Sequence, residues 1–191
     1  MRVISGRFRG RKLHGPAGLE LRPTSDRLKE TLFDILGAWI QDRVLLDVFA
    51  GTGAIGIEAI SRGAREAVFI EQSKEGCRLI RRNLNVCGIT TGYTLVQQEA
   101  FAALRRLARQ DSVADVIFMD PPYRWQPYAD LLRIVFQMRL AVKGTKVIVE
   151  HQRKSELPES GQGYLRVRVV RQGDHCLSFY SASSEEAARL P

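Results

Sequence analysis

Short apolar runs alternate with amphipathic segments along the middle of the chain. The apolar runs at 44–50, 67–70, 93–97, 113–119 and 146–150 predict strands. Segments with apolar residues three or four positions apart, at 55–62, 74–87, 100–108 and 128–138, predict helices between them. Strands that alternate with helices form a parallel sheet with helices on both faces. We therefore predict an α/β fold.

The two ends of the chain depart from this alternation. Residues 164–171 and 175–181, joined by Gln172-Gly173-Asp174, predict an antiparallel hairpin that closes the sheet. Glycine-separated segments in residues 2–13 predict a second hairpin, and apolar residues from Leu28 to Trp39 predict a helix with Thr24 or Ser25 as its N-cap. We divide the chain into a basic hairpin and helix (1–40), a main α/β domain (41–182) and a polar tail (183–191).

Composition places the chain among ordinary globular proteins. Its 191 residues are 45% hydrophobic and 26% charged. No apolar run is long enough to cross a bilayer, and residues 1–7 lack a secretory signal, so we expect a cytoplasmic protein. Its three cysteines form no C-x-x-C pair and predict buried thiols rather than a zinc site. The net charge of +8 favours a polyanionic partner.

A glycine-rich turn follows the first strand of the alternating region. Asp47-Val48-Phe49-Ala50-Gly51-Thr52-Gly53-Ala54-Ile55-Gly56 links that strand to the next helix. Glycines let the backbone approach a ligand, and amides at a helix N-terminus favour anionic groups. Glu71 ends the second strand, where nucleotide-binding folds place a carboxylate that grips ribose hydroxyls. Residues 49–56, which we call the glycine turn, therefore predict a cofactor site together with Glu71; the alternative is a tight strand-to-helix turn packed against the sheet.

Asp47 distinguishes two kinds of cofactor. A carboxylate inside an apolar strand has a desolvation cost and needs a partner. S-adenosylmethionine carries an ammonium and a sulfonium, which suit a nearby carboxylate, whereas the pyrophosphate of a dinucleotide would be repelled. We therefore expect S-adenosylmethionine. The alternative for Asp47 is a structural carboxylate bonded to loop amides.

The fourth strand delivers Asp120-Pro121-Pro122-Tyr123 at its carboxyl end, the edge where open α/β sheets bind ligands. An exocyclic base amine is a poor nucleophile because its lone pair is delocalised into the ring. The Asp120 carboxylate and the Pro121 carbonyl can accept its N–H groups and draw it toward tetrahedral geometry. Tyr123 offers a stacking surface worth about 1–3 kcal/mol per base. If the carboxyl edges of strands one and four meet, this arrangement predicts amine methylation; an ordinary Asp-Pro loop is the alternative.

Three motifs together resemble a known family. Asp47-x-Phe49-x-Gly51-x-Gly53 resembles the first motif of class I methyltransferases, and Asp120-Pro121-Pro122-Tyr123 resembles their amino-methylating motif. The third motif closely resembles the bacterial D-type small-subunit ribosomal RNA guanine-N2 methyltransferases: Gly6-x-x-Arg9-Gly10-Arg11-Lys12-Leu13 and then Arg22-Pro23-Thr24-x-Asp26-Arg27-x-Lys29-Glu30-x-Leu32-Phe33. The resemblance spans nearly the whole chain. It implies a Rossmann-like fold with a seven-stranded, mostly parallel sheet. It also implies methylation of N2 of one guanine in a 16S rRNA hairpin loop, within an assembled or partly assembled small subunit.

These arguments and the resemblance define three groups of expected site residues. The catalytic group is Asp120, Pro121, Pro122 and Tyr123. The cofactor group comprises Thr24, Asp47, Phe49, Gly51, Gly53, Ala54, Gly56, Glu71, Gln72, Glu99 and Ala100. Thr24, Glu99 and Ala100 are implied by the resemblance, although the family more often has Asp or Asn where Glu99 stands. The group expected to bind RNA comprises Arg7, Arg9, Arg11, Lys12, Arg22, Arg27 and Trp125. Its cations would contact phosphates, while Trp125, like Phe8, would stack on splayed bases. The alternative is that the arginines are solvated and that the aromatic rings cover the core or the hairpin; Arg22 and Arg27 could also bind the cofactor carboxylate or form structural ion pairs.

Other functions use parts of the same pattern. A DNA adenine-N6 or cytosine-N4 methyltransferase shares the Asp120-Pro121-Pro122-Tyr123 motif, but the chain has no extra segment large enough to read duplex sequence. A nicotinamide dehydrogenase is disfavoured by Asp47 and by that motif. A catalytically idle RNA-binding or ribosome assembly module remains a third alternative. No metal is expected in any of them.

Overall fold

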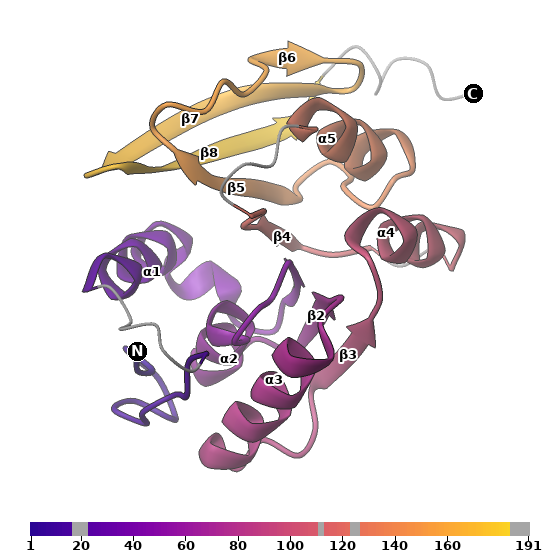
Figure 1. Cartoon of the computed structure of the whole chain (residues 1–191). Coiled ribbons are helices and arrows are strands. Elements are labelled where there is room, and N and C mark those ends of the chain that lie inside the picture. The colour runs from indigo at the N-terminus through magenta and orange to yellow at the C-terminus, as the bar shows by residue number, and fades with distance from the viewer. Residues whose placement is uncertain (17–22, 111–112, 123–126, 184–191) are drawn as a thin grey trace. The chain divides into compact units, whose positions relative to one another are not determined.

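The computed structural model describes residues 1–16, 23–110, 113–122 and 127–183, with only the backbone at 23–25. The chain forms two compact units, Met1–Glu99 and Ala100–Pro191, and each is described by itself (Figure 1). Both units follow the strand and helix order that the sequence predicts. Within the described residues, no helix is long and apolar enough to span a membrane.

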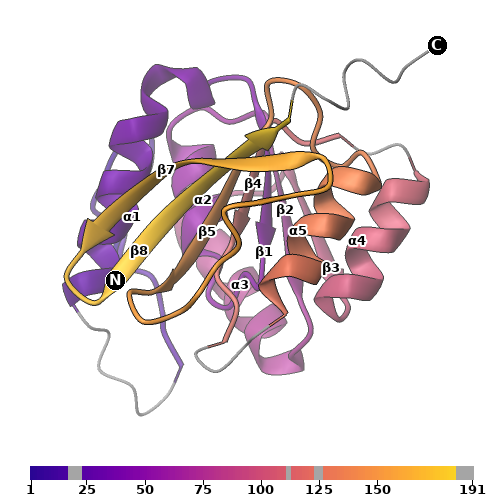
Figure 2. The ribbon, with the colours of Figure 1, turned by 90° about the horizontal axis from the view of Figure 1, so that it is seen from above.

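The first unit contains a parallel sheet with the strand order β3-β2-β1 (Figure 2). Its elements are α1 (Pro23–Leu36), the 3-10 helix η1 (Gly37–Ile40), β1 (Val44–Val48), α2 (Ala54–Ser61), β2 (Glu66–Glu71), α3 (Lys74–Cys87) and β3 (Tyr93–Gln97). Val48 pairs with Ile70 and Glu71 with Gln97, so the carboxyl ends of the three strands lie at one edge. That edge carries the glycine turn and Glu71.

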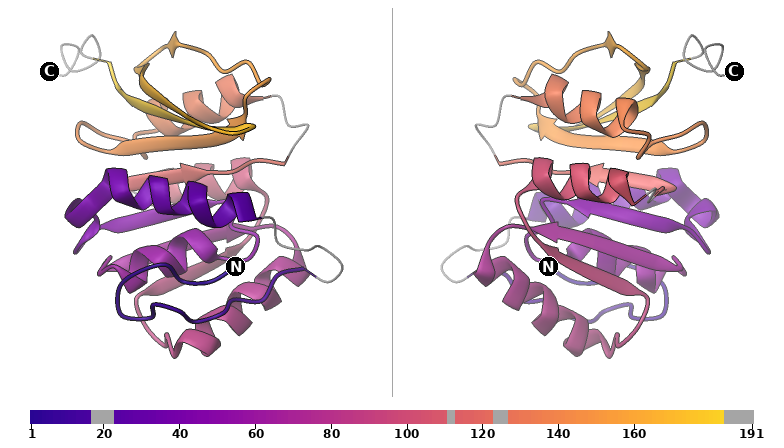
Figure 3. Two further views of the ribbon diagram at one scale, coloured as in Figure 1. Left: turned by 90° about the vertical axis from the view of Figure 1, so that its left-hand side faces the viewer. Right: turned by 90° about the vertical axis from the view of Figure 1, so that its right-hand side faces the viewer.

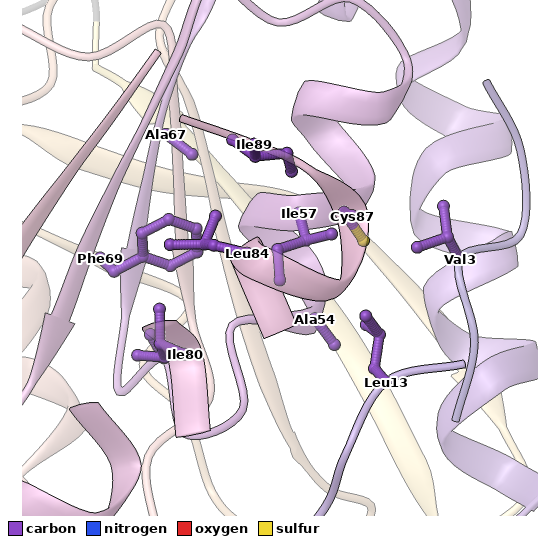
Figure 4. Close-up of a cluster of buried hydrophobic side chains, with 11 residues drawn as sticks. Val3, Leu13, Ala54, Ile57, Ala67, Phe69, Ile80, Leu84, Cys87 and Ile89 are labelled. Carbon is purple, nitrogen blue, oxygen red and sulfur yellow. The ribbon is translucent and has the colours of Figure 1, made fainter. Parts of the chain in front are cut away.

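Residues 1–16, which we call the N-terminal arm, fold back on themselves and lie across α2 and α3 (Figure 3). An antiparallel bridge joins Arg2 to Lys12, which confirms the predicted hairpin in a minimal form. Val3 and Leu13 are buried in a cluster with Ile57 and Cys87 (Figure 4). The arm therefore belongs to the core of the first unit through its apolar side chains.

The second unit contains the mixed sheet order β4-β5-β8-β7-β6. Its elements are α4 (Ala100–Arg109), β4 (Val116–Met119), α5 (Tyr128–Gln137), β5 (Lys146–Gln152), β6 (Ser160–Gly161), β7 (Tyr164–Gln172) and β8 (His175–Ala182). β4 and β5 are parallel, whereas β8 runs antiparallel to both β5 and β7. The β7–β8 pair is the hairpin predicted for the end of the sheet.

The predicted fold class, a mostly parallel α/β fold that ends in an antiparallel hairpin, is confirmed. Two details differ. The described residues hold eight strands rather than seven, because the two-residue β6 adds to the edge of β7. The first helix begins at Pro23, so the prediction that Thr24 or Ser25 is its N-cap is wrong. Proline is favoured in the first turn of a helix, because it lacks only an N–H that would have no partner there.

Candidate functional site

The glycine turn depends on an unusual backbone path between β1 and α2. Phe49, Gly51 and Gly53 all have positive φ angles, of 65°, 54° and 75°. Phe49 is the residue for which this conformation is costly, because it has a side chain. The Gly53 amide donates to the Ala50 carbonyl over 2.7 Å, and the Ala50 amide donates to the Ile70 carbonyl over 2.9 Å. The turn is therefore held at the carboxyl edge of β1 and β2, where the sequence predicted the cofactor.

Gly56 brings α2 into close contact with the sheet. A Cβ atom at this position would lie 2.2 Å from Cε1 of Phe69, a buried residue of β2. Only a residue without a side chain fits there. Gly56 therefore supports the turn through packing, and Ala54, also buried, begins the helix.

Asp47 is buried in β1, and its Oδ2 accepts a hydrogen bond from the Gly56 amide over 3.0 Å. Burial raises the pKa of this carboxyl to about 7; the Gly56 hydrogen bond opposes the shift, and the negative charge of Glu71 adds to it. The structural alternative for Asp47 is thus present, since the carboxylate does bond to a backbone amide. A nearby cation, such as the ammonium or sulfonium of a ligand, would stabilise the ionised form of this carboxyl.

Glu71 ties the end of β2 to the glycine turn. Its Oε2 accepts from the Gly51 amide over 2.8 Å, and its Oε1 accepts from the Ser73 amide over 2.7 Å. A Cβ atom on Gly76 would lie 2.7 Å from Cδ of Glu71, so a glycine leaves room for this carboxylate. Each carboxylate oxygen retains a lone pair for a further donor, such as a ribose hydroxyl.

The remaining expected cofactor residues have less defined surroundings. Gln72 and Glu99 are exposed, and Ala100 is buried as the first residue of α4. Thr24 lies in the first turn of α1, where only the backbone is described. The first unit thus brings together Asp47, the glycine turn and Glu71.

The expected acceptor site lies at the end of β4 in the second unit. All four residues of β4 are buried. Of the residues that follow, Asp120 and Pro122 are exposed and Pro121 is buried. Burial raises the pKa of Tyr128 at the start of α5, and the negative charge of Asp120 adds to that shift. The predictions for Tyr123 and Trp125 lie outside the described residues.

The N-terminal arm presents its cations to solvent. Arg7, Arg9, Arg11 and Lys12 are exposed, as is Arg27 on α1, whereas Arg22 lies outside the described residues. The ring of Phe8 packs against the buried cluster under the arm and lies beneath the Arg7 guanidinium, 5.3 Å from ring centroid to Cζ. This packing agrees with the alternative that Phe8 covers the core, and base stacking by its partly exposed ring stays a prediction.

Glu58, which the sequence analysis did not select, holds the arm in place. This fully buried carboxylate of α2 accepts from the amides of Ile4 and Ser5, over 2.7 and 3.0 Å. Arg62 lies 2.8 Å and Lys29 3.6 Å from its oxygens. An acid among the apolar residues of α2 was the signal in the sequence, but its partners lie up to 54 positions away.

Asn83 was also missed. It is buried in α3 and bonds to the backbone of His14 and of Thr52. Its signal was an amide on the apolar face of an amphipathic helix, between Ile80 and Leu84. Buried polar groups in such positions need partners, but the pattern alone does not say which.

The sequence of the chain is similar to those of known proteins. The sequence profile of the family described as Conserved hypothetical protein 95 matches residues 1–181. The chain is 35% identical over 160 residues to the Putative rRNA methyltransferase YlbH of Bacillus subtilis, covering 84% of this chain and 87% of that protein. It is 31% identical over 157 residues to the Ribosomal RNA small subunit methyltransferase D of Haemophilus influenzae, covering 82% and 81%. The chain belongs to this D-type methyltransferase family.

The solved structures agree with membership of the D-type family. A structure described as the putative methyltransferase yhhF from Escherichia coli matches with a TM-score of 0.82 and 28% identity. The match covers 96% of this chain and 98% of that one. The resemblance drawn from the arm, the glycine turn and Asp120-Pro121-Pro122-Tyr123 is confirmed at the level of the family.

Proposed function

We propose that this chain is an S-adenosylmethionine-dependent methyltransferase that modifies the N2 amine of a guanine in 16S ribosomal RNA. The observation that carries the proposal is the contact between Glu71 and Gly51, which builds a carboxylate and the glycine turn into one edge of the sheet. Relatives of the chain are named as ribosomal RNA methyltransferases, and this supports the choice of reaction and substrate.

Two carboxyl groups of the first unit fit the cofactor. When bound, S-adenosylmethionine supplies an electrophilic methyl group on a sulfonium. Asp47, with its pKa raised to about 7, offers a carboxyl that ionises readily beside a positive charge. Glu71 keeps acceptor capacity for ribose hydroxyls while its two amide bonds hold it still. These two residues bind and orient the cofactor and take no part in proton transfer from the base.

Asp120 and Pro121 act on the target amine. The Asp120 carboxylate and the Pro121 carbonyl accept hydrogen bonds from the two N–H groups. The nitrogen then becomes more tetrahedral, and its lone pair is less delocalised into the ring. That lone pair forms the new bond to the methyl carbon, and the electrons of the carbon–sulfur bond remain on sulfur. The cationic amine then loses a proton to Asp120 or to water. Most of the rate comes from positioning, since effective molarities in well-oriented reactions are large.

The mechanism requires the methyl group of the cofactor to reach the amine held by Asp120 and Pro121. The exposed cations Arg7, Arg9 and Arg11 supply phosphate contacts that make RNA binding weaken with salt.

The test incubates the protein and tritiated S-adenosylmethionine with three substrates: unmodified small subunits, naked 16S rRNA, and DNA. We expect label in RNA, and nucleoside mass spectrometry should identify N2-methylguanosine. Label in DNA alone would overturn the proposal and favour an adenine or cytosine amino-methyltransferase. Binding of RNA without any label would favour an idle assembly module.

A pair of variants tests the acceptor residue. Asp120→Ala should lower the rate at least about 100-fold, because loss of one positioned acceptor removes a few kcal/mol of transition-state stabilisation. The matched control is Asp130→Ala, which removes an exposed carboxylate of α5 in the same unit. Equal rates in Asp120→Ala and the control would remove Asp120 from the mechanism.

A further inference from the structure

Asn83 joins the N-terminal arm to the glycine turn through three hydrogen bonds. Its Oδ1 accepts from the His14 amide over 2.7 Å, and its Nδ2 donates to the His14 carbonyl over 3.0 Å and to the Thr52 carbonyl over 2.9 Å. The side chain is fully buried, so no bulk water competes for these groups. One amide therefore satisfies backbone groups from two segments that are 38 positions apart in the sequence, from 14 to 52.

Thr52 lies at the centre of the glycine turn. It lies between Gly51 and Gly53, and both glycines adopt positive φ angles, a region open to glycine at little cost. The turn is held on one side by Glu71, which accepts from the Gly51 amide, and on the other by Asn83, which donates to the Thr52 carbonyl. Asn83 thus helps to fix the backbone of the segment expected to contact the cofactor.

His14 follows the basic residues of the arm. Lys12 bridges Arg2 across the hairpin, and the intervening Leu13 is buried against the cluster that includes Leu84 and Cys87 of α3. A ligand that restrains Arg11 or Lys12 would therefore also restrain the His14 backbone, which lies two or three residues further along the chain. The side chain of Asn83 alone links His14 to Thr52 through hydrogen bonds.

We propose that Asn83 is a positioning residue that couples occupancy of the basic arm to occupancy of the cofactor turn. This inference rests on the proposed function, because it takes RNA as the ligand of the arm and S-adenosylmethionine as the ligand of the turn. RNA that immobilises the arm also restrains His14, Asn83 and Thr52. The conformational entropy cost of ordering the turn when the cofactor binds is then smaller. Each ligand therefore tightens binding of the other by the same factor.

The decisive variant is Asn83→Asp. An ionised Asp keeps the acceptor for the His14 amide and loses both donors, so the Thr52 carbonyl loses its partner while the arm keeps one bond. Asn83→Ala removes all three bonds. Asn85→Ala is the matched control, because Asn85 is the same residue type on the same helix and is exposed.

The experiment measures the dissociation constant of tritiated S-adenosylhomocysteine by equilibrium dialysis, with and without saturating unmodified small subunits. We expect the wild type and Asn85→Ala to bind about fivefold or more tightly in the presence of subunits. The factor should fall to about one in both Asn83 variants. For Asn83→Asp it should partly recover at acidic pH, because a protonated carboxyl regains one donor for a carbonyl.

The outcomes separate this inference from the proposed function. A wild type that binds neither ligand refutes the proposed function. A wild type that binds both without coupling, or Asn83 variants with unchanged coupling, overturns the role of Asn83 alone. If both variants fail to fold, hydrogen exchange in the wild type decides: the His14 amide, which donates to Asn83, should exchange more slowly when S-adenosylhomocysteine is bound. Unchanged exchange at His14 overturns the inference.

Discussion

The carboxylate of Glu71 receives the amide of Gly51 across 2.8 Å, so the end of β2 determines the conformation of the turn that follows β1. A second amide, from Ser73, fixes the other carboxylate oxygen. Glu71 thus shapes the turn, and we propose that it also accepts hydrogen bonds from the cofactor. Loss of its charge should affect both.

Glu71→Gln is expected to weaken binding of S-adenosylhomocysteine by about 10- to 100-fold, the range for a lost hydrogen bond to a charged group. The NH₂ group of the glutamine would face one of the two backbone N–H groups. Both groups are donors, so no hydrogen bond could form there. Titration calorimetry provides the measurement. Glu75→Gln, which alters an exposed acid of α3, is the control and should bind like the wild type. Equal affinities in the two variants would contradict the assignment.

Cofactor binding should release a proton from Asp47 near neutral pH. Burial raises the pKa of this carboxyl to about 7, and a bound cation would lower it again. Calorimetry at pH 7 in buffers of different ionisation enthalpy counts the protons released. Asp47→Asn should release none from this position, and a proton count unchanged by the substitution would refute the idea.

The same carboxyl has a predictable effect on stability. The pKa of this carboxyl is raised above the ordinary value of 3.8. Its contribution to the free energy of unfolding is therefore fully present below about pH 4 and is lost as pH rises through about 7. Asp47→Asn keeps an acceptor for the Gly56 amide and removes this decline. Urea unfolding at pH 5 and pH 8 should therefore show a smaller drop in the variant than in the wild type.

Gly56→Ala should destabilise the protein by about 1–3 kcal/mol, because the added Cβ would lie 2.2 Å from the Phe69 ring. The sign is informative, since glycine to alanine in an unobstructed helix stabilises by about 1 kcal/mol. Thermal or urea unfolding gives the difference. The double variant Gly56→Ala/Phe69→Leu should lose less stability than the sum of the two single variants. A stabilised Gly56→Ala variant would show that the contact is easily relieved.

Glu58→Gln should release the N-terminal arm. The change leaves Lys29 and Arg62 beside a neutral group in a buried position, and breaking such a cluster typically costs about 3–5 kcal/mol. Trypsin should then cut after Arg7 or Arg9 faster than in the wild type. Glu30→Gln, at an exposed position on α1, is the control, and similar cleavage of both variants would remove Glu58 as the anchor.

The periodicity of the sequence predicted the order of strands and helices because burial in this fold follows local patterns. The alternating region, the glycine turn and the final hairpin all lie within a residue or two of their expected positions, apart from β4, which begins at Val116. Local sequence patterns did not predict the roles of residues whose contacts lie far away in the sequence. Phe8 packs against the buried cluster, and Glu58 and Asn83 bond to backbone groups 31 to 69 positions away.

The main chain of the arm contributes to its attachment. Glu58 receives the amides of Ile4 and Ser5, and a Cβ on Gly6 would lie 1.9 Å from the Ser61 carbonyl oxygen, so attachment depends on the peptide backbone and on one missing side chain as well as on buried Val3 and Leu13. The side chains of Arg7, Arg9 and Arg11 are exposed. We therefore expect them to tolerate substitution, so that the charged surface of the arm can change while the scaffold beneath stays the same.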